Sequence, residues 1–181
     1  MGKRGHEIHV PRIDQACRAA AHGSRVRTRA HRLSASAQPA SAAATPFENL
    51  AGSWSGNGVV VLAGGSKERI RCRVTYDVAE NGRSVQQNLR CASDSYTFDL
   101  KSNIQYADGY ITGRWNESSR NKSGTISGRV SGNLIDALAE TSGFSAFLTL
   151  TTRGNRQQVR IKSESTEITE VTITLSRGGS R

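Results

Sequence analysis

From Phe47 onward, apolar and polar residues alternate along the chain with a period of two, which is the pattern of strands that bury one face. Apolar residues at helical spacing are absent from this region. Turn signals separate the alternating runs every ~8–12 residues, as in sandwiches and barrels. We therefore predict an all-β fold with strands at residues 53–62, 67–78, 84–92, 95–106, 110–118, 124–131, 134–140, 144–152, 156–163 and 168–176.

The hairpin around Asn81-Gly82 sets a register, because Asn-Gly favours a two-residue turn in which both residues adopt positive φ. This register places Cys72 directly opposite Cys91, and facing Cβ atoms lie about 4.5–5.5 Å apart, close to what a disulfide requires. We predict a Cys72–Cys91 disulfide, and two reduced thiols in a cytosolic protein are the alternative. The pair falls on a nominally hydrogen-bonded position, where a direct disulfide is less favourable. A bulge that shifts the register by one residue is therefore an open alternative.

The same register sorts the side chains of this hairpin onto an apolar face and a polar face. The inward face holds Ile70, Cys72, Val74, Tyr76, Val78, Val85, Leu89 and Cys91, and the outward face holds Arg69, Arg71, Arg73, Thr75 and Asp77. Hairpins at Asp108-Gly109 and Gly132-Asn133 extend the inward set across later strands. Its small members are expected to leave space inside the fold; they are Gly113, Gly128, Ala137, Ala139 and Ala146.

A short stretch at residues 46–50 leads into Gly52-Ser53-Trp54, and the predicted strands follow. This arrangement resembles the calycin superfamily, the lipocalin-like barrels, in which a 3₁₀ turn precedes a Gly-x-Trp motif on the first strand. The resemblance implies a closed antiparallel up-and-down barrel of about 8–10 strands. It also implies that Trp54 packs across one end of the barrel and that Arg177 lies over it as a second structural residue.

The chain departs from true lipocalins in several ways. It lacks their second central motif and a C-terminal helix, and its predicted disulfide joins adjacent strands. A small exported barrel of bacterial type is therefore the nearer likeness. Haem-binding barrels of related shape hold iron with a barrel histidine, but this chain has no histidine after His31. We predict no haem and no other cofactor.

Charge and composition divide the chain into two parts. Residues 1–45 carry eight of the 25 lysines and arginines, two of the 15 acidic residues, all four histidines and no aromatic residue. Such a segment has little to bury, so we predict a disordered, basic, Ala/Ser-rich leader or tail at 1–45 and a lipocalin-like barrel at 46–181. No apolar stretch approaches 18 residues, so no membrane span is predicted.

The leader bears on the compartment. Its small-residue runs at 34–38 and 40–44 resemble the cleavage end of a signal peptide, but residues 25–32 are arginine-rich where an apolar segment should stand. Three interpretations stay open: a signal peptide with a mis-assigned start site, a low-complexity linker, and an organellar transit peptide. Together with the disulfide, the first of these predicts a secreted or periplasmic protein.

The predicted barrel offers few groups for catalysis. Without a histidine, it cannot build a Ser–His or Cys–His nucleophile pair or a Cys/His metal site. Its acidic residues are scattered, and Gly64-Gly65 lies in a turn with no helix after it to cradle a phosphate. We predict no catalytic residue, no metal site and no enzymatic activity.

Binding is the function that the pattern favours. We predict a non-enzymatic exported protein that carries a small apolar or amphipathic ligand inside the barrel. The candidate lining is Tyr76, Phe98, Tyr106, Trp115 and Phe144, with Glu117 at the rim. Two alternatives stay open: the aromatic residues are simply core, and Glu117 is solvated beyond a strand that ends at Asn116.

The outward face offers a second class of function. Arg69, Arg71 and Arg73 form a stripe beside Arg90 that could hold an anionic envelope surface, although a solvated strand face is the commoner meaning. No aromatic residue is interleaved with these arginines, so no nucleic-acid partner is expected. The alternative function is a filled barrel that acts through its surface as an envelope interaction or inhibitor-type protein. A cavity of about 300 Å³ or more would favour the ligand carrier.

Overall fold

The computed structural model describes residues 45–164 and 166–178. The predicted leader lies outside the described residues except for Thr45, so this division of the chain stays a prediction. A 3₁₀ turn, η1 (Glu48–Leu50), precedes ten strands. They are β1 (Gly52–Leu62), β2 (Lys67–Ala79), β3 (Ser84–Ala92), β4 (Thr97–Ala107), β5 (Tyr110–Glu117), β6 (Lys122–Ser131), β7 (Leu134–Thr141), β8 (Phe144–Arg153), β9 (Arg156–Ser163) and β10 (Ile168–Arg177).

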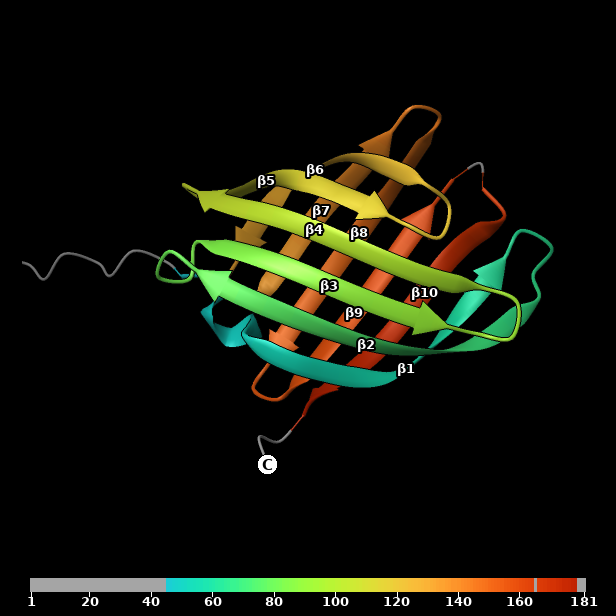
Figure 1. The fold of residues 1–181 in the computed structure, drawn as a ribbon, viewed down its shortest axis with the longest axis horizontal. Coiled ribbons are helices and arrows are strands. Elements are labelled where there is room, and N and C mark those ends of the chain that lie inside the picture. Colours follow the sequence, from blue (N-terminus) through green and yellow to red (C-terminus); the bar gives the residue numbers. More distant parts are fainter. Residues whose placement is uncertain (1–44, 165, 179–181) are drawn as a thin grey trace, which may run out of the picture. The chain divides into compact units, whose positions relative to one another are not determined.

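The ten strands form a closed barrel in which each strand pairs antiparallel with its neighbours in sequence and β1 pairs with β10. Figure 1 shows β2–β5 crossing in front of β7–β10. The predicted all-β, up-and-down barrel is confirmed. We call the end that carries η1 and the turns at 80–83, 108–109, 132–133 and 154–155 the η1 end, and the other the opposite end. Within the described ranges, no helix is long and apolar enough to cross a bilayer.

The β2–β3 hairpin has the predicted partners but a wider turn. Cys72 lies opposite Cys91 and forms the disulfide, with Cα atoms 4.1 Å apart. The turn spans residues 80–83, and Glu80, Asn81 and Gly82 all have positive φ, so the two-residue turn is wrong. The short Cα distance fits a non-hydrogen-bonded pair, whose Cα atoms lie about 4.5 Å apart rather than about 5.5 Å. No bulge shifts the register at this pair.

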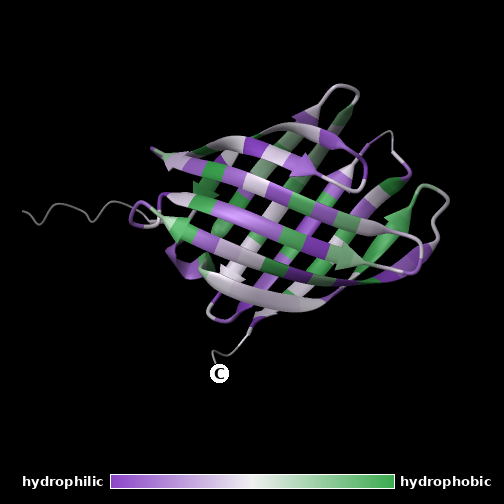
Figure 2. Ribbon diagram, in the orientation of Figure 1, coloured by the Kyte–Doolittle hydropathy of each residue, from purple (hydrophilic) through white to green (hydrophobic). Residues whose placement is uncertain are grey.

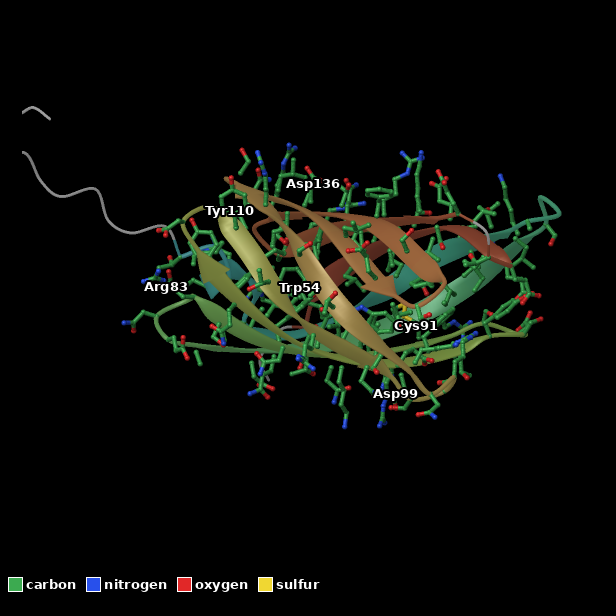
Figure 3. All side chains as sticks on the ribbon, turned by 90° about the horizontal axis from the view of Figure 1, so that it is seen from above. Trp54, Arg83, Cys91, Asp99, Tyr110 and Asp136 are labelled. Atoms are coloured by element: carbon green, nitrogen blue, oxygen red, sulfur yellow. A yellow bond between two sulfur atoms is a disulfide. The ribbon has the colours of Figure 1, made fainter. Side chains whose placement is uncertain are left out.

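Buried and exposed residues alternate along strands such as β2 and β4, and Figure 2 shows the matching alternation of apolar and polar residues along the strands at the front of the barrel. The interior of the barrel is filled by buried side chains, among them Trp54, Val60, Ile70, Val74, Val85, Ile104, Ile111, Trp115, Ile173 and Leu175. Trp54 and Cys91 lie inside the barrel in Figure 3, whereas Asp99 and Asp136 lie on its outer surface. Apolar burial inside a closed sheet therefore forms a continuous core.

The inward glycines do not leave the space that the sequence suggested. A Cβ atom added to Gly113 would overlap the carbonyl oxygen of Asn103 on β4, and one added to Gly128 would overlap that of Asp136 on β7. The expectation that these glycines create space is therefore wrong. Because these glycines have no Cβ atom, the backbones of β4 and β7 can lie where the Cβ atom of a larger residue would be.

Candidate functional site

Trp54, Arg177 and η1 together cover part of the η1 end. Trp54 is 1% exposed and its indole N–H donates to the carbonyl oxygen of Leu50 at 2.7 Å. The Arg177 guanidinium lies 4.5 Å from the Trp54 ring centroid and donates to the carbonyl oxygens of Ala51, at 2.6 Å, and Asn49. This is the placement that the calycin resemblance implies for the two side chains. Three hydrogen bonds thus hold η1 across the barrel.

The segment around η1 also contacts the β2–β3 turn and β4. The backbone N–H of Phe47 donates to the carbonyl oxygen of Gly82 at 3.2 Å. The Phe47 ring meets Tyr106 of β4 edge-on, with ring centroids 6.4 Å apart. These contacts lie on the side of the barrel formed by β1–β4, so the end of the barrel near β6–β8 is not covered in the same way.

A pocket of about 390 Å³ lies at this less covered part of the η1 end. Its walls come from the η1 segment, from β4 and from β6–β8. The lining residues are Thr45, Pro46, Asn49, Leu50, Tyr106, Val130, Gly132, Asn133, Ile135, Leu150 and Thr152. Val130, Ile135 and Leu150 are register partners on three adjacent strands, and so they form one apolar cross-strand row.

A buried chain of polar side chains leads to this pocket. The Tyr76 hydroxyl donates to Gln157 Oε1 at 3.0 Å, and Gln157 Nε2 donates to Thr152 Oγ1 at 3.2 Å. Gln157 is fully buried and Thr152 is 8% exposed. Burial raises the pKa of Tyr76 well above its usual range, against the smaller lowering by Gln157, so the phenol stays protonated as a donor.

The direction of these hydrogen bonds leaves the hydroxyl proton of Thr152 without an acceptor among the described residues. Thr152 Oγ1 accepts from Gln157, and the hydrogen bonds among the described residues include no acceptor for its own hydroxyl proton. A hydroxyl can donate one hydrogen bond while it accepts others. Because Thr152 lines the pocket, its proton is available to a hydrogen-bond acceptor on a bound molecule.

The predicted lining residues do not gather in one place. Tyr106 alone lines the η1-end pocket, and Tyr76 reaches it through Gln157. Phe98, Trp115, Glu117 and Phe144 face inward in the opposite half of the barrel. There the rings of Trp115 and Phe144 meet edge-on at 6.2 Å, and Arg120 lies 4.5 Å from the Phe98 ring centroid. A ligand role for these aromatic residues stays a prediction.

Glu117 is the last residue of β5 and is only 6% exposed, so the interpretation that it is solvated beyond the strand is wrong. Its carboxylate accepts hydrogen bonds from the backbone N–H groups of Asp99 at 3.0 Å, Ser119 at 3.1 Å and Arg120 at 2.8 Å. Burial alone would raise the pKa of Glu117, but these hydrogen bonds outweigh it and hold the pKa below its usual range. Backbone groups of β4 and of the following loop therefore occupy the carboxylate.

The outward arginines are exposed, as their register requires. Arg73 lies opposite Arg90, and the Arg90 side chain pairs with Asp99 at 3.2 Å. Arg69 and Arg71 point outward on the same strand. An envelope surface as their partner stays a prediction.

Sequence reasoning missed Gln157 and Thr152. They are register partners on β9 and β8 at inward positions, so two facing polar residues interrupt an apolar face. That interruption was the available signal, because a buried polar side chain needs a partner. No three His, Cys, Asp or Glu side chains are grouped to hold a metal in the part of the chain that the structure describes.

Comparisons with known proteins give a fold but no family. No family model matches the chain, and no curated protein matches its sequence. The S-type phycobiliprotein lyase CPES from Guillardia theta superimposes with a TM-score of 0.54 at 13% identity, covering 75% of this chain and 92% of its own. Rv2717c from M. tuberculosis superimposes with a TM-score of 0.56 at 11% identity, covering 72% and 94%.

These likenesses support a calycin-like barrel fold, and at such identities they extend no further than the fold. They also correct one prediction. Enzymatic activity was excluded because the barrel lacks histidine, yet a barrel of the same fold is itself named a lyase. The absence of a familiar nucleophile pair is therefore not a valid ground for excluding enzymes from this fold.

Proposed function

We propose that this chain is a member of the calycin superfamily that binds a small molecule in the η1-end pocket. The observation that carries the proposal is the pocket itself. Its volume of about 390 Å³ lies within the range of small-molecule sites, which begins at about 300 Å³. Four of the lining residues have inward apolar or aromatic side chains: Tyr106, Val130, Ile135 and Leu150.

The lining also indicates the class of ligand. None of the described side chains that line the pocket carries a charge, so a charged ligand would lose its hydration without compensation from them. The Thr152 hydroxyl already accepts a hydrogen bond from Gln157 Nε2, so it can donate its own proton to the ligand. The ligand that fits is a neutral molecule with an apolar body and a carbonyl or ether oxygen at the Thr152 end.

The compartment is a further part of the proposal. The Cys72–Cys91 disulfide supports an oxidising location such as the periplasm or the extracellular space, since thiols stay reduced in most cytosols. Thiol titration of the denatured chain from its native host tests this directly. Two free thiols at these positions would contradict export.

Binding of prodan, a neutral naphthalene ketone, tests the pocket. The full chain should bind the dye and shift its emission to the blue. Leu150→Trp fills the pocket and should lower the affinity at least about tenfold. Leu148→Trp is the matched control, because Leu148 faces inward on the same strand but does not line the pocket. Thr152→Val should weaken binding roughly fivefold through loss of about 1 kcal/mol of hydrogen bonding.

Several outcomes would overturn the proposal. The first is no binding of prodan by the folded wild-type chain. The second is loss of binding in Leu148→Trp with retention in Leu150→Trp, which would place the ligand toward the opposite end. Near-ultraviolet circular dichroism of each variant separates these outcomes from simple unfolding. It is needed for Thr152→Val too, because that variant also removes the acceptor of the buried Gln157 Nε2.

A further inference from the structure

The outer surface of the barrel carries a second depression, unconnected with the η1-end pocket. It has a volume of about 580 Å³ and spans the outward faces of β2–β6. We call it the outer groove. No residue that lines it also lines the η1-end pocket. Whatever it binds is therefore independent of the function proposed above.

The strand register arranges the side chains of the outer groove in two parallel rows. Asp77, Gln86, Asn103 and Arg114 are successive partners across β2–β5. Asn88, Lys101 and Asn116 are successive partners in the neighbouring row across β3–β5. Because adjacent strands lie about 4.8 Å apart, the rows present a polar side chain at regular intervals to a ligand that crosses the strands.

Three asparagines stand at exposed positions in these rows: Asn88, Asn103 and Asn116. Asparagine is depleted in strands, because its short amide competes for local backbone hydrogen bonds. Threonine or valine would suit such positions better for folding alone. Departures from local preference of this kind concentrate at functional positions. The sequence of the groove therefore indicates binding rather than sheet stability.

The two cations of the outer groove have no ion-pair partner among the residues that the structure describes. Arg90 and Arg160, elsewhere on the outer surface, are paired with Asp99 and Glu170 at 3.2 and 2.9 Å. Lys101 and Arg114 have no carboxylate within salt-bridge distance among the described residues, although they occupy adjacent strands of the groove. Two neighbouring unpaired cations repel each other, and an anionic group placed between them removes that repulsion.

We propose that the outer groove binds an acidic oligosaccharide. Carboxamides both donate and accept hydrogen bonds, which matches sugar hydroxyls that do the same. Arg114 and Lys101 supply the donors for a sugar carboxylate, and arginine can bind it through two nitrogens. Nucleic acid fits less well, because bases stack on exposed aromatic rings. The aromatic residue of the groove, Trp115, instead points inward and donates to the Thr125 carbonyl at 3.0 Å.

Isothermal titration of the full chain with oligogalacturonate tests this proposal. Dextran of equal length serves as the neutral sugar, and a short DNA duplex serves as a different polyanion. Lys101→Gln and Arg114→Gln should each lower the oligogalacturonate affinity roughly tenfold, and Asn103→Ala roughly threefold to fivefold. Arg71→Gln removes the same charge from an exposed residue on the same outer face but outside the groove. It should change the affinity less than about twofold.

The alternatives give different results. No binding of oligogalacturonate, or equal binding of dextran, would overturn the acidic sugar. Tighter binding of DNA would assign the groove to another polyanion, and an equal loss in Arg71→Gln would show that attraction is spread over the surface. All four substitutions are at exposed positions, so the variants should unfold at the same denaturant concentration as the wild type. Binding of prodan to the η1-end pocket should be unchanged in all of them.

Discussion

The two ends of the barrel use the same contact in different surroundings. At the η1 end the Arg177 guanidinium lies over Trp54, and at the opposite end the Arg120 guanidinium lies over Phe98, each 4.5 Å from the ring centroid. Both arginines also donate to backbone carbonyl oxygens. Trp54 is 1% exposed, whereas Phe98 remains partly exposed. The arginine at the η1 end joins distant segments, and Arg120 contacts Thr97, beside Phe98, at the start of β4.

From this difference we expect burial, more than the contact type, to determine how much an arginine–aromatic pair contributes to the stability of the fold. A cation over a ring contributes about 0.5–1 kcal/mol when exposed and about 2 kcal/mol or more when desolvated. Removal of a buried aromatic side chain also leaves a cavity. The η1 end should therefore dominate stability. At the opposite end, the carboxylate of Glu117 accepts hydrogen bonds from the backbone of β4 and of its own loop.

Alanine substitutions should give the largest difference between the two ends. Trp54→Ala should destabilise the fold by about 3–5 kcal/mol, because it removes a fully buried indole and frees η1. Phe98→Ala should cost at most about 2 kcal/mol, since its ring is already partly hydrated. Urea unfolding followed by circular dichroism measures both free energies. Equal losses in the two variants would contradict the comparison.

The fold was predictable because its signals are local. Asp108-Gly109 and Gly132-Asn133 mark hairpins by their tolerance of positive φ, and the alternation between them assigns each face. The strand bounds observed lie within two residues of those predicted. The Cys72–Cys91 pairing followed from the register of the β2–β3 hairpin. The turn of this hairpin is wider than predicted, but the facing residues are the same, so the pairing is unchanged.

The candidate site was less predictable, because it depends on distances between segments remote in sequence. The pocket exists where η1 leaves part of the barrel end uncovered, which no local pattern specifies. The short distance between Gly113 and the backbone of β4 likewise depends on the three-dimensional path of the strands in the closed barrel. Glu117 was placed inward by register, but its backbone partners at Ser119 and Arg120 depend on the conformation of the following loop.

Glu117→Gln should give the next largest effect and a change in pH dependence. Glutamine keeps one acceptor oxygen but turns an NH2 group toward a backbone N–H of Asp99, Ser119 or Arg120. The buried mismatch should cost about 1–3 kcal/mol at pH 7. The folded pKa of Glu117 is lowered, so its stabilisation is present above the unfolded pKa of about 4.3. It is lost as the pH falls through the folded pKa.

Urea unfolding at a series of pH values from neutral to about 3 measures this effect. The free energy of unfolding of the wild type and the variant should converge as the pH falls below about 4.3. A difference between them that stays constant over this range would show that the carboxylate does not act through its charge. Trp54→Ala provides the contrast, because its loss at the η1 end should persist at every pH.

Lysine substitutions give the smallest and most specific comparison. Arg177→Lys keeps the charge but cannot donate to the Asn49 and Ala51 carbonyl oxygens while it covers the Trp54 ring, so we expect a loss of about 1 kcal/mol. Arg120→Lys should cost less than about 0.5 kcal/mol, because its single carbonyl contact and its ring are partly solvated.

Backbone amide hydrogen exchange shows where in the barrel each variant loses stability. The backbone N–H of Ala51 donates to the carbonyl oxygen of Glu48 at the end of η1. Arg177→Lys should speed the exchange of this amide, and Arg120→Lys should leave its exchange rate unchanged. Faster exchange at Ala51 in both variants would show that the two ends are energetically coupled through the filled core, and the ends would then have to be treated as one cooperative unit.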